Sequence, residues 1–193
     1  MTFQFKPLTA GLLEDFLYFF DYIAFSDNPA WAGCYCHYYH NPCNQREWQR
    51  RRGEENRNAS KELILSGRMS GYLAFMSDRP IGWCNVNRKS NFARLMTERE
   101  LRFSDDDKVA SIVCFIVAPQ YRKQGVAWRL LKEACSGFIT EECDYIEAYP
   151  RKDMLSDAQH YHGPFSMYIK EGFASYKNCN EYTIVRKKLR GRT

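Results

Sequence analysis

Residues 122–127 form a short segment that is suited to binding an anion. Its residues are Arg122, Lys123, Gln124, Gly125, Val126 and Ala127. A glycine at position 125 permits a tight turn and lets a ligand approach the backbone closely. The helix expected to begin just after it presents unpaired N–H groups and the positive end of its dipole. Together with the two cationic side chains, these features favour the binding of a pyrophosphate.

A strand, a helix and a second strand are expected to position this segment. Val109–Val117 is apolar at almost every position, as in a strand buried on both faces, and Pro119 ends it. The apolar stripe from Val126 to Phe138 has helical spacing, and Tyr145–Tyr149 has the composition of a strand. This order predicts a βαβ unit with parallel strands and a right-handed crossover.

The other elements predict a mixed α/β sheet. Strands are expected over Phe3–Pro7, Phe173–Tyr176 and Tyr182–Lys187, a hairpin over Tyr72–Met76 and Ile81–Val86, and helices over Leu12–Phe25, Ala59–Leu65 and Pro164–Lys170. A polar connection that contains Asp105, Asp106 and Asp107 precedes the central strand. No repeat or linker divides the chain, so we expect one domain over residues 1–193.

Composition excludes several classes of protein. The 193 residues are 45% hydrophobic and 26% charged, which is typical of a globular chain and excludes disorder and collagen. No apolar run approaches the roughly 20 residues of a membrane span. Without a secretory signal, we expect a cytoplasmic location and eight reduced cysteines. The net charge of +5 suits an anionic ligand but is low for a nucleic-acid binder.

Two motifs carry a resemblance to a known family. The stretch FIVAPQYRKQGVAWRLL (Phe115–Leu131) resembles the acetyl-CoA-binding core of the GNAT (general N-acetyltransferase) superfamily. Downstream, MYIKEGF (Met167–Phe173) is similar to the second signature of that superfamily, a helix with a tyrosine followed by Gly-Phe. From about Trp31 onward, the sequence also resembles a bacterial subgroup of this superfamily that has a Cys-x-Cys segment, here Cys34-x-Cys36.

The resemblance implies a fold and a reaction. The fold is a central mixed sheet, flanked by helices and splayed between two parallel strands. The reaction is acetyl-CoA-dependent N-acetylation, in which a primary amine attacks the thioester directly. Phe115, Ile116 and Val117 are then expected to bind the pantetheine arm, and residues 122–127 the pyrophosphate. An N–H near Phe115 would stabilise the oxyanion.

The resemblance also names an acid and leaves the base open. Tyr168 stands at the usual tyrosine position, where a phenol can protonate the departing thiolate. Ser111 stands where many members carry a glutamate base, and serine cannot replace it. Glu147, near the carboxyl end of the next parallel strand and expected to face the cleft, is the best substitute. His160 and His162 are alternatives, as are ordered water or an acceptor that binds already deprotonated.

A cluster of cysteines and histidines has no role in that scheme. Its members are Cys34, Cys36, His37, His40 and Cys43. Because C-x-C is tighter than the common zinc spacing, we expect no metal site. We expect instead a loop whose aromatic residues line the acceptor pocket, with core packing as the other reading. Those aromatic residues are Trp31, Tyr35, Tyr38 and Tyr39. Cys114, in a buried strand, is expected to be a neutral thiol rather than a nucleophile.

The partners are less well defined by the sequence. The basic run from Arg46 to Arg57 fits a solvated face, an acidic acceptor or a nucleic acid, and we do not favour nucleic acid. The acceptor is a small molecule or a peptide that carries an amine, and relatives in the superfamily are often homodimers. The alternative to an enzyme is a non-catalytic CoA-binding or metal-sensing module of the same fold.

Overall fold

The apolar strand expected at Val109–Val117 lies in the middle of the sheet. The computed structural model describes residues 2–97, 101, 108–152 and 160–189, and these form one seven-stranded sheet with the order β1-β2-β3-β4-β5-β7-β6. The strands are β1 (Phe3–Pro7), β2 (Gly71–Met76), β3 (Arg79–Arg88), β4 (Val109–Val117), β5 (Tyr145–Ala148), β6 (Ala174–Asn178) and β7 (Thr183–Lys188). Neighbouring strands are antiparallel except β4 and β5, which are parallel. The expected mixed sheet is confirmed.

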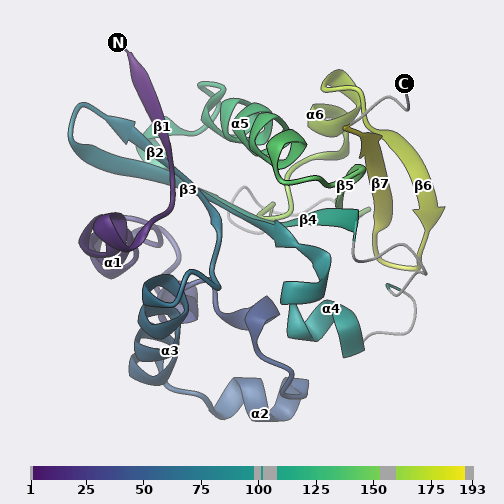
Figure 1. The fold of residues 1–193 in the computed structure, drawn as a ribbon. Coiled ribbons are helices and arrows are strands. Elements are labelled where there is room, and N and C mark those ends of the chain that lie inside the picture. The colour runs from purple at the N-terminus through teal and green to yellow at the C-terminus, as the bar shows by residue number, and fades with distance from the viewer. Residues whose placement is uncertain (1, 98–100, 102–107, 153–159, 190–193) are drawn as a thin grey trace.

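Helices cover both faces of the sheet (Figure 1). On one face α5 (Val126–Thr140) and α6 (Phe165–Lys170) pack over the sheet, and on the other lie α1 (Leu13–Tyr22) and α3 (Gly53–Leu65). The connections contain α2 (Gln45–Arg50), α4 (Ala93–Thr97) and the 3₁₀ turns η1 (Ala10–Leu12), η2 (Pro29–Cys34), η3 (Tyr38–His40), η4 (Lys89–Asn91) and η7 (Pro119–Tyr121). No helix among the described residues is long and apolar enough to cross a membrane.

Each face of the sheet has its own apolar core. The stripe of α5, from Val126 to Phe138, is buried against one face of the sheet, as its helical spacing predicts. On the other face, Phe16 of α1 packs edge-on against Trp83 of β3, with ring centroids 5.2 Å apart. β4 contributes residues to both cores: Ala110, Ile112 and Phe115 to one, and Val113, Cys114 and Ile116 to the other. Successive side chains of a strand point to opposite faces, except here at Val113 and Cys114, where the register with β3 shifts. This explains the continuous apolar run of that strand.

β4 and β5 pair over only part of their length. The parallel register runs from Val109↔Tyr145 to Ile112↔Ala148, whereas β4 continues beside β3 as far as Val117. Within the described ranges, the last residues of β4 therefore have a neighbouring strand on one side only. This opening is the splay that the resemblance implies.

Some elements differ from the expectations. The helix expected over Ala59–Leu65 is α3, which begins earlier, at Gly53. The Arg52 N–H donates to the Glu55 side chain at 2.6 Å and caps this earlier first turn. α2, which was not expected, begins after a capping box between Asn44 and Glu47 that the sequence does contain. The segment with Asp105, Asp106 and Asp107 lies outside the described residues.

Candidate active site

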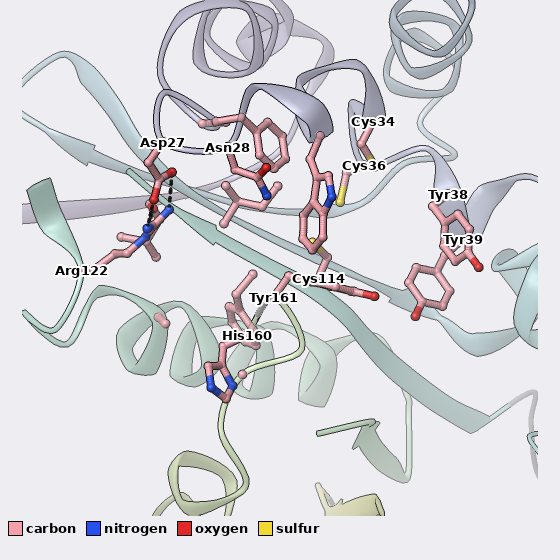
Figure 2. A pocket seen from close by; sticks show the side chains of 18 of the residues that line it. Asp27, Asn28, Cys34, Cys36, Tyr38, Tyr39, Cys114, Arg122, His160 and Tyr161 are labelled. Atoms are coloured by element: carbon pink, nitrogen blue, oxygen red, sulfur yellow. Dashed lines mark hydrogen bonds and ion pairs between the residues drawn. The ribbon is translucent and has the colours of Figure 1, made fainter. Parts of the chain in front are cut away.

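A cavity of about 890 Å³ lies beside the splayed end of β4. Four parts of the chain line it: residues 24–56, the end of β4, the turn into α5, and residues 160–167. Figure 2 shows Arg122 and Asp27 at one end, Tyr38 and Tyr39 at the other, and the sulfur atoms of three cysteines between them. The cavity thus joins the expected cofactor loop to an aromatic compartment.

The turn into α5 has the backbone geometry of an anion site. Gly125 is the N-cap of α5 with a φ of +80°, in the left-handed region that favours glycine. A Cβ added there would meet no atom within 4 Å, so the backbone faces open space. All the expected loop residues line the cavity except Gln124, whose side-chain amide donates to the Gln120 carbonyl at 2.8 Å.

The side chain of Arg122 already has an anionic partner. Its Nη2 lies 3.0 Å from Asp27 Oδ1, its Nη1 contacts the other carboxylate oxygen, and its Nε donates to the Val117 carbonyl at 3.0 Å. The hydrogen bond from Arg122 and its charge lower the pKa of Asp27. Asp27 was not predicted as a site residue, because no local pattern in the sequence connects it to a loop 95 positions away.

The open edge of β4 carries the backbone groups expected to hold the pantetheine arm. The N–H of Ala118 donates to Ile81 on β3, so the N–H groups of Phe115 and Val117 point to the open side. Phe115, Ile116 and Val117 all line the cavity. The N–H of Phe115 donates to the carbonyl of Tyr161 at 2.5 Å. The expected oxyanion donor is therefore engaged by the chain itself in this structure.

Tyr168 lies just behind the cavity wall. Its hydroxyl is buried and donates to the His162 carbonyl at 2.5 Å. A Cβ added to Gly163, which lines the cavity, would lie 3.2 Å from this hydroxyl. Burial raises the pKa of Tyr168 well above its usual value, so the phenol keeps its proton at neutral pH.

Glu147 faces a buried ion-pair network and not the cleft, which corrects the expected orientation. Its carboxylate lies 2.8 Å from Lys89 Nζ and 2.8 Å from Arg186 Nη2, and all three side chains are nearly inaccessible. The Tyr149 hydroxyl donates to the same carboxylate at 2.6 Å, and Ser111 lies 2.9 Å from that hydroxyl. The orientation of Glu147 could not be predicted from the sequence, because its two cationic partners, Lys89 and Arg186, come from distant segments.

The histidines differ in their relation to the cavity. His160 lines it, whereas His162 is buried behind Tyr39, whose hydroxyl lies 3.2 Å from His162 Nε2. Burial and the charge of Arg151 lower the pKa of His162 to about 3. Burial also lowers the pKa values of His37 and His40 to about 4. These three rings are neutral at physiological pH and serve as packed polar groups.

Three thiols form the floor of the cavity. Cys34, Cys36 and Cys114 line it, and all eight cysteines are free. The Cys36 and Cys114 thiols are in hydrogen-bond contact, which raises the pKa of Cys114 well above its usual value together with burial. Burial raises the pKa of Cys36, but hydrogen bonds from Cys114 and Asn85 outweigh it and lower the net value. Among the described residues, no group of three or more histidines, cysteines or carboxylates could hold a metal ion.

The aromatic compartment agrees in part with the expectation. Trp31, Tyr38 and Tyr39 line the cavity, from the 3₁₀ turns η2 and η3. Tyr35 does not, because its hydroxyl donates to Asp21 at 2.6 Å and its ring stacks on Phe20. Its backbone is in the left-handed region, with a φ of 44°. Trp48 of α2 adds a further ring to the compartment.

Comparisons with known proteins agree with this geometry. The model of the acetyltransferase (GNAT) family matches residues 33–163, and the chain belongs to that family. No curated protein matches the chain. Among solved structures, the chain resembles PaiA N-acetyltransferase from Thermoplasma acidophilum in complex with coenzyme A, with 18% identity, a TM-score of 0.58, and coverage of 97% of this chain and 99% of that one.

Two further solved structures have the same fold. An N-acetyltransferase from Staphylococcus aureus Mu50 is 12% identical, with a TM-score of 0.58 and coverage of 98% of this chain and 100% of that one. An acetyltransferase from Thermus thermophilus is 13% identical, with a TM-score of 0.56 and coverage of 97% of both chains. The family match and these shared folds place the protein among the acyltransferases.

Proposed function

We propose that this protein is an acetyl-CoA-dependent N-acetyltransferase that moves an acetyl group directly to a primary amine. The proposal rests on one observation: two stretches of backbone line the same cavity. The splayed edge of β4 and the glycine-capped start of α5 both open onto it. Family membership supports the same reaction class.

The residues present fit coenzyme A. The N–H groups in the first turn of α5 have no helical partners, and the open space at Gly125 would admit a diphosphate. The N–H groups of Phe115 and Val117 suit the amide-bearing pantetheine arm. When bound, acetyl-CoA supplies an activated thioester. Use of the Phe115 N–H on the thioester carbonyl requires Tyr161 to move aside, because its carbonyl now accepts that hydrogen bond.

Tyr168 is the proposed acid. Its high pKa keeps the phenol protonated until a thiolate develops nearby, and its hydroxyl lies next to the Gly163 wall. Glu147 is not retained as the base, because both its oxygens are bound by cations or hydroxyls away from the cavity. The proposal therefore uses an acceptor that reacts from its neutral amine form. As the amide forms, the acceptor nitrogen loses a proton, and this proton restores the Tyr168 phenol that protonated the departing thiolate.

Calorimetry with matched glycine variants tests the cofactor site. Gly125→Trp should block the diphosphate and abolish acetyl-CoA binding, whereas Gly67→Trp should leave it unchanged. Gly67 is a suitable control because it also has a positive φ, of +69°, and open space at its Cβ, but it does not line the cavity. Failure of the wild type to bind millimolar acetyl-CoA would refute the proposed function.

A further inference from the structure

We propose that Arg51 binds a carboxylate of the acceptor, so that the acceptor is a small primary amine with a carboxylate and an apolar or aromatic body. This inference rests on the proposed function and names its substrate class. It concerns the aromatic compartment, at the opposite end of the cavity from the loop that opens α5 (Figure 2).

Arg51 is held in place through one edge of its guanidinium. It follows α2 and lines the cavity, and its Nε donates to Asn56 Oδ1 at 2.7 Å. Asn56 is only 3% exposed, and its Nδ2 donates to the Gly33 carbonyl at 2.8 Å. Among the residues that the structure describes, neither terminal nitrogen of Arg51 has a partner. The fixed edge thus leaves the two terminal nitrogens, with their N–H groups, for a ligand.

Two glycines make this anchor possible. A Cβ on Gly33 would lie 3.0 Å from the Gly53 Cα, and a Cβ on Gly53 would lie 3.1 Å from the Gly33 Cα. The turn η2 and the start of α3 therefore cross at contact distance beside the cavity. Any side chain at this crossing would separate the Gly33 carbonyl from Asn56, and with it the support of Arg51.

Arg51 differs from the other arginines of the basic run and its surroundings. Arg57 forms an ion pair with Asp21 at 3.0 Å. Arg94 is buried, lies over the Tyr38 ring and donates to the carbonyl groups of Tyr38 and Cys43. Arg51 is the member of the run that lines the cavity. The basic segment therefore has one residue suited to an acidic acceptor.

The charges of the described cavity lining favour an anion at this end. Its one carboxylate is Asp27, which is already paired with Arg122 at the far end. One guanidinium balances one negative charge, which matches a carboxylate better than a phosphate of nearly two charges. A polycationic acceptor would find no carboxylate partner among the described residues of this compartment. The positive charge of Arg51 would also lower the pKa of a nearby ammonium and favour the neutral amine that attacks.

Four aromatic rings of the cavity lining define the rest of the acceptor. Trp48 packs edge-on against Tyr38, with centroids 5.1 Å apart, and Trp31 packs edge-on against Tyr161 at 5.5 Å. All four rings line the cavity. They form apolar walls within which a flat or branched hydrocarbon body would lose contact with water. An aromatic amino acid combines the three required features.

Matched acceptor pairs test the assignment. Tryptophan and phenylalanine are compared with their carboxamides, which have nearly the same size but no negative charge. Acetylated products are quantified by mass spectrometry, because cysteine thiols would interfere with thiol reagents. We expect the wild type to prefer the carboxylates about tenfold or more in kcat/KM. Arg51→Gln should abolish this preference, and Arg51→Lys should retain part of it, because an ammonium lacks the planar fork.

The control is Arg50→Gln, which removes the same charge from the exposed neighbour outside the cavity and should keep the full preference. Acetyl-CoA affinity, measured by calorimetry, should be the same in all variants. Equal use of carboxylates and amides, or a preference that survives Arg51→Gln, would overturn the inference. So would acetyl-CoA binding without turnover of any panel member, whereas absence of acetyl-CoA binding would instead overturn the proposed function.

Discussion

The guanidinium of Arg122 and the carboxylate of Asp27 form a two-point ion pair across one end of the cavity (Figure 2). Arg122 belongs to the turn that opens α5, and Asp27 to the segment between α1 and η2. The same guanidinium also donates through Nε to the Val117 carbonyl. Arg122 is therefore held at the expected diphosphate site by two independent contacts, of which only one carries negative charge.

Neutralising Asp27 should strengthen cofactor binding. In Asp27→Asn, the contact with Val117 still holds Arg122, while the competing carboxylate is removed. Because the pair is partly exposed, we expect a modest change, of about threefold in the Kd for acetyl-CoA at low salt. Calorimetry at two ionic strengths measures it, and the difference should shrink at high salt. Weaker binding by the variant would show that Asp27 positions Arg122 rather than competing for it.

Removing the Tyr168 hydroxyl should slow turnover without weakening cofactor binding. A general acid contributes about a hundredfold or more to the rate, so Tyr168→Phe should lower kcat by that order. The His162 carbonyl also loses its donor, at a cost of about 1–3 kcal/mol of unfolding free energy. Tyr22→Phe is the control, since that side chain is exposed on α1.

The kinetic result separates two roles of Tyr168. If kcat per folded molecule stays within twofold of the wild type, the hydroxyl only supports the fold. A non-catalytic CoA-binding module would bind acetyl-CoA but acetylate no amine in either form. The measurement therefore uses calorimetry and turnover on the same preparations.

Glu147→Gln should destabilise the fold strongly. The change leaves Lys89 and Arg186 as buried cations without their shared carboxylate, and breaking such a pair costs roughly 3–5 kcal/mol. Urea unfolding measures the loss. The control Glu181→Gln breaks an exposed pair with Arg151 and should change stability by less than about 1 kcal/mol.

A second variant keeps this prediction testable if the single change prevents folding. Glu147→Gln combined with Lys89→Met removes one unpaired cation and should recover part of the stability. A folded Glu147 variant should retain turnover with an unchanged pH profile. A large loss of kcat in fully folded protein would instead restore Glu147 as the base.

Stability should fall as the pH is lowered from 7 to 5. The pKa values of His37 and His40 are about 4, and that of His162 about 3, all below the usual 6.5. Between those values and 6.5 the unfolded chain binds more protons, so acid favours unfolding. Each histidine should cost on the order of 2 kcal/mol at pH 5. Asp21 and Asp27 have lowered pKa values and lose their contribution only at lower pH.

Urea unfolding at pH 7, 6 and 5 measures this slope. His162→Leu removes one of the three rings and should reduce the slope by about a third, although the variant itself is less stable because Tyr39 loses its partner. An unchanged slope in His162→Leu would contradict the assignment of a buried neutral ring.

The mixed sheet, its seven strands and the loop that opens α5 could be predicted from the amino-acid sequence. The signals were local: the continuous apolar run of β4, the proline that ends it, the glycine at 125 and the helical stripe from Val126 to Phe138. Such signals predict strands, helices and turns correctly because each of these elements depends mainly on residues that are neighbours along the chain. The capping box at Asn44 and the hydrogen bond from the Arg52 N–H to Glu55 are also local, and neither was predicted.

Which polar groups face the cavity depends on how distant segments of the chain pack together. This packing pairs Arg122 with Asp27 and Glu147 with Lys89 and Arg186, and it leaves Arg51 at the acceptor end. These contacts join segments tens of residues apart, so no spacing rule predicts them. A charged side chain is buried at low cost only beside an opposite charge. The packing of distant elements determines where that opposite charge lies.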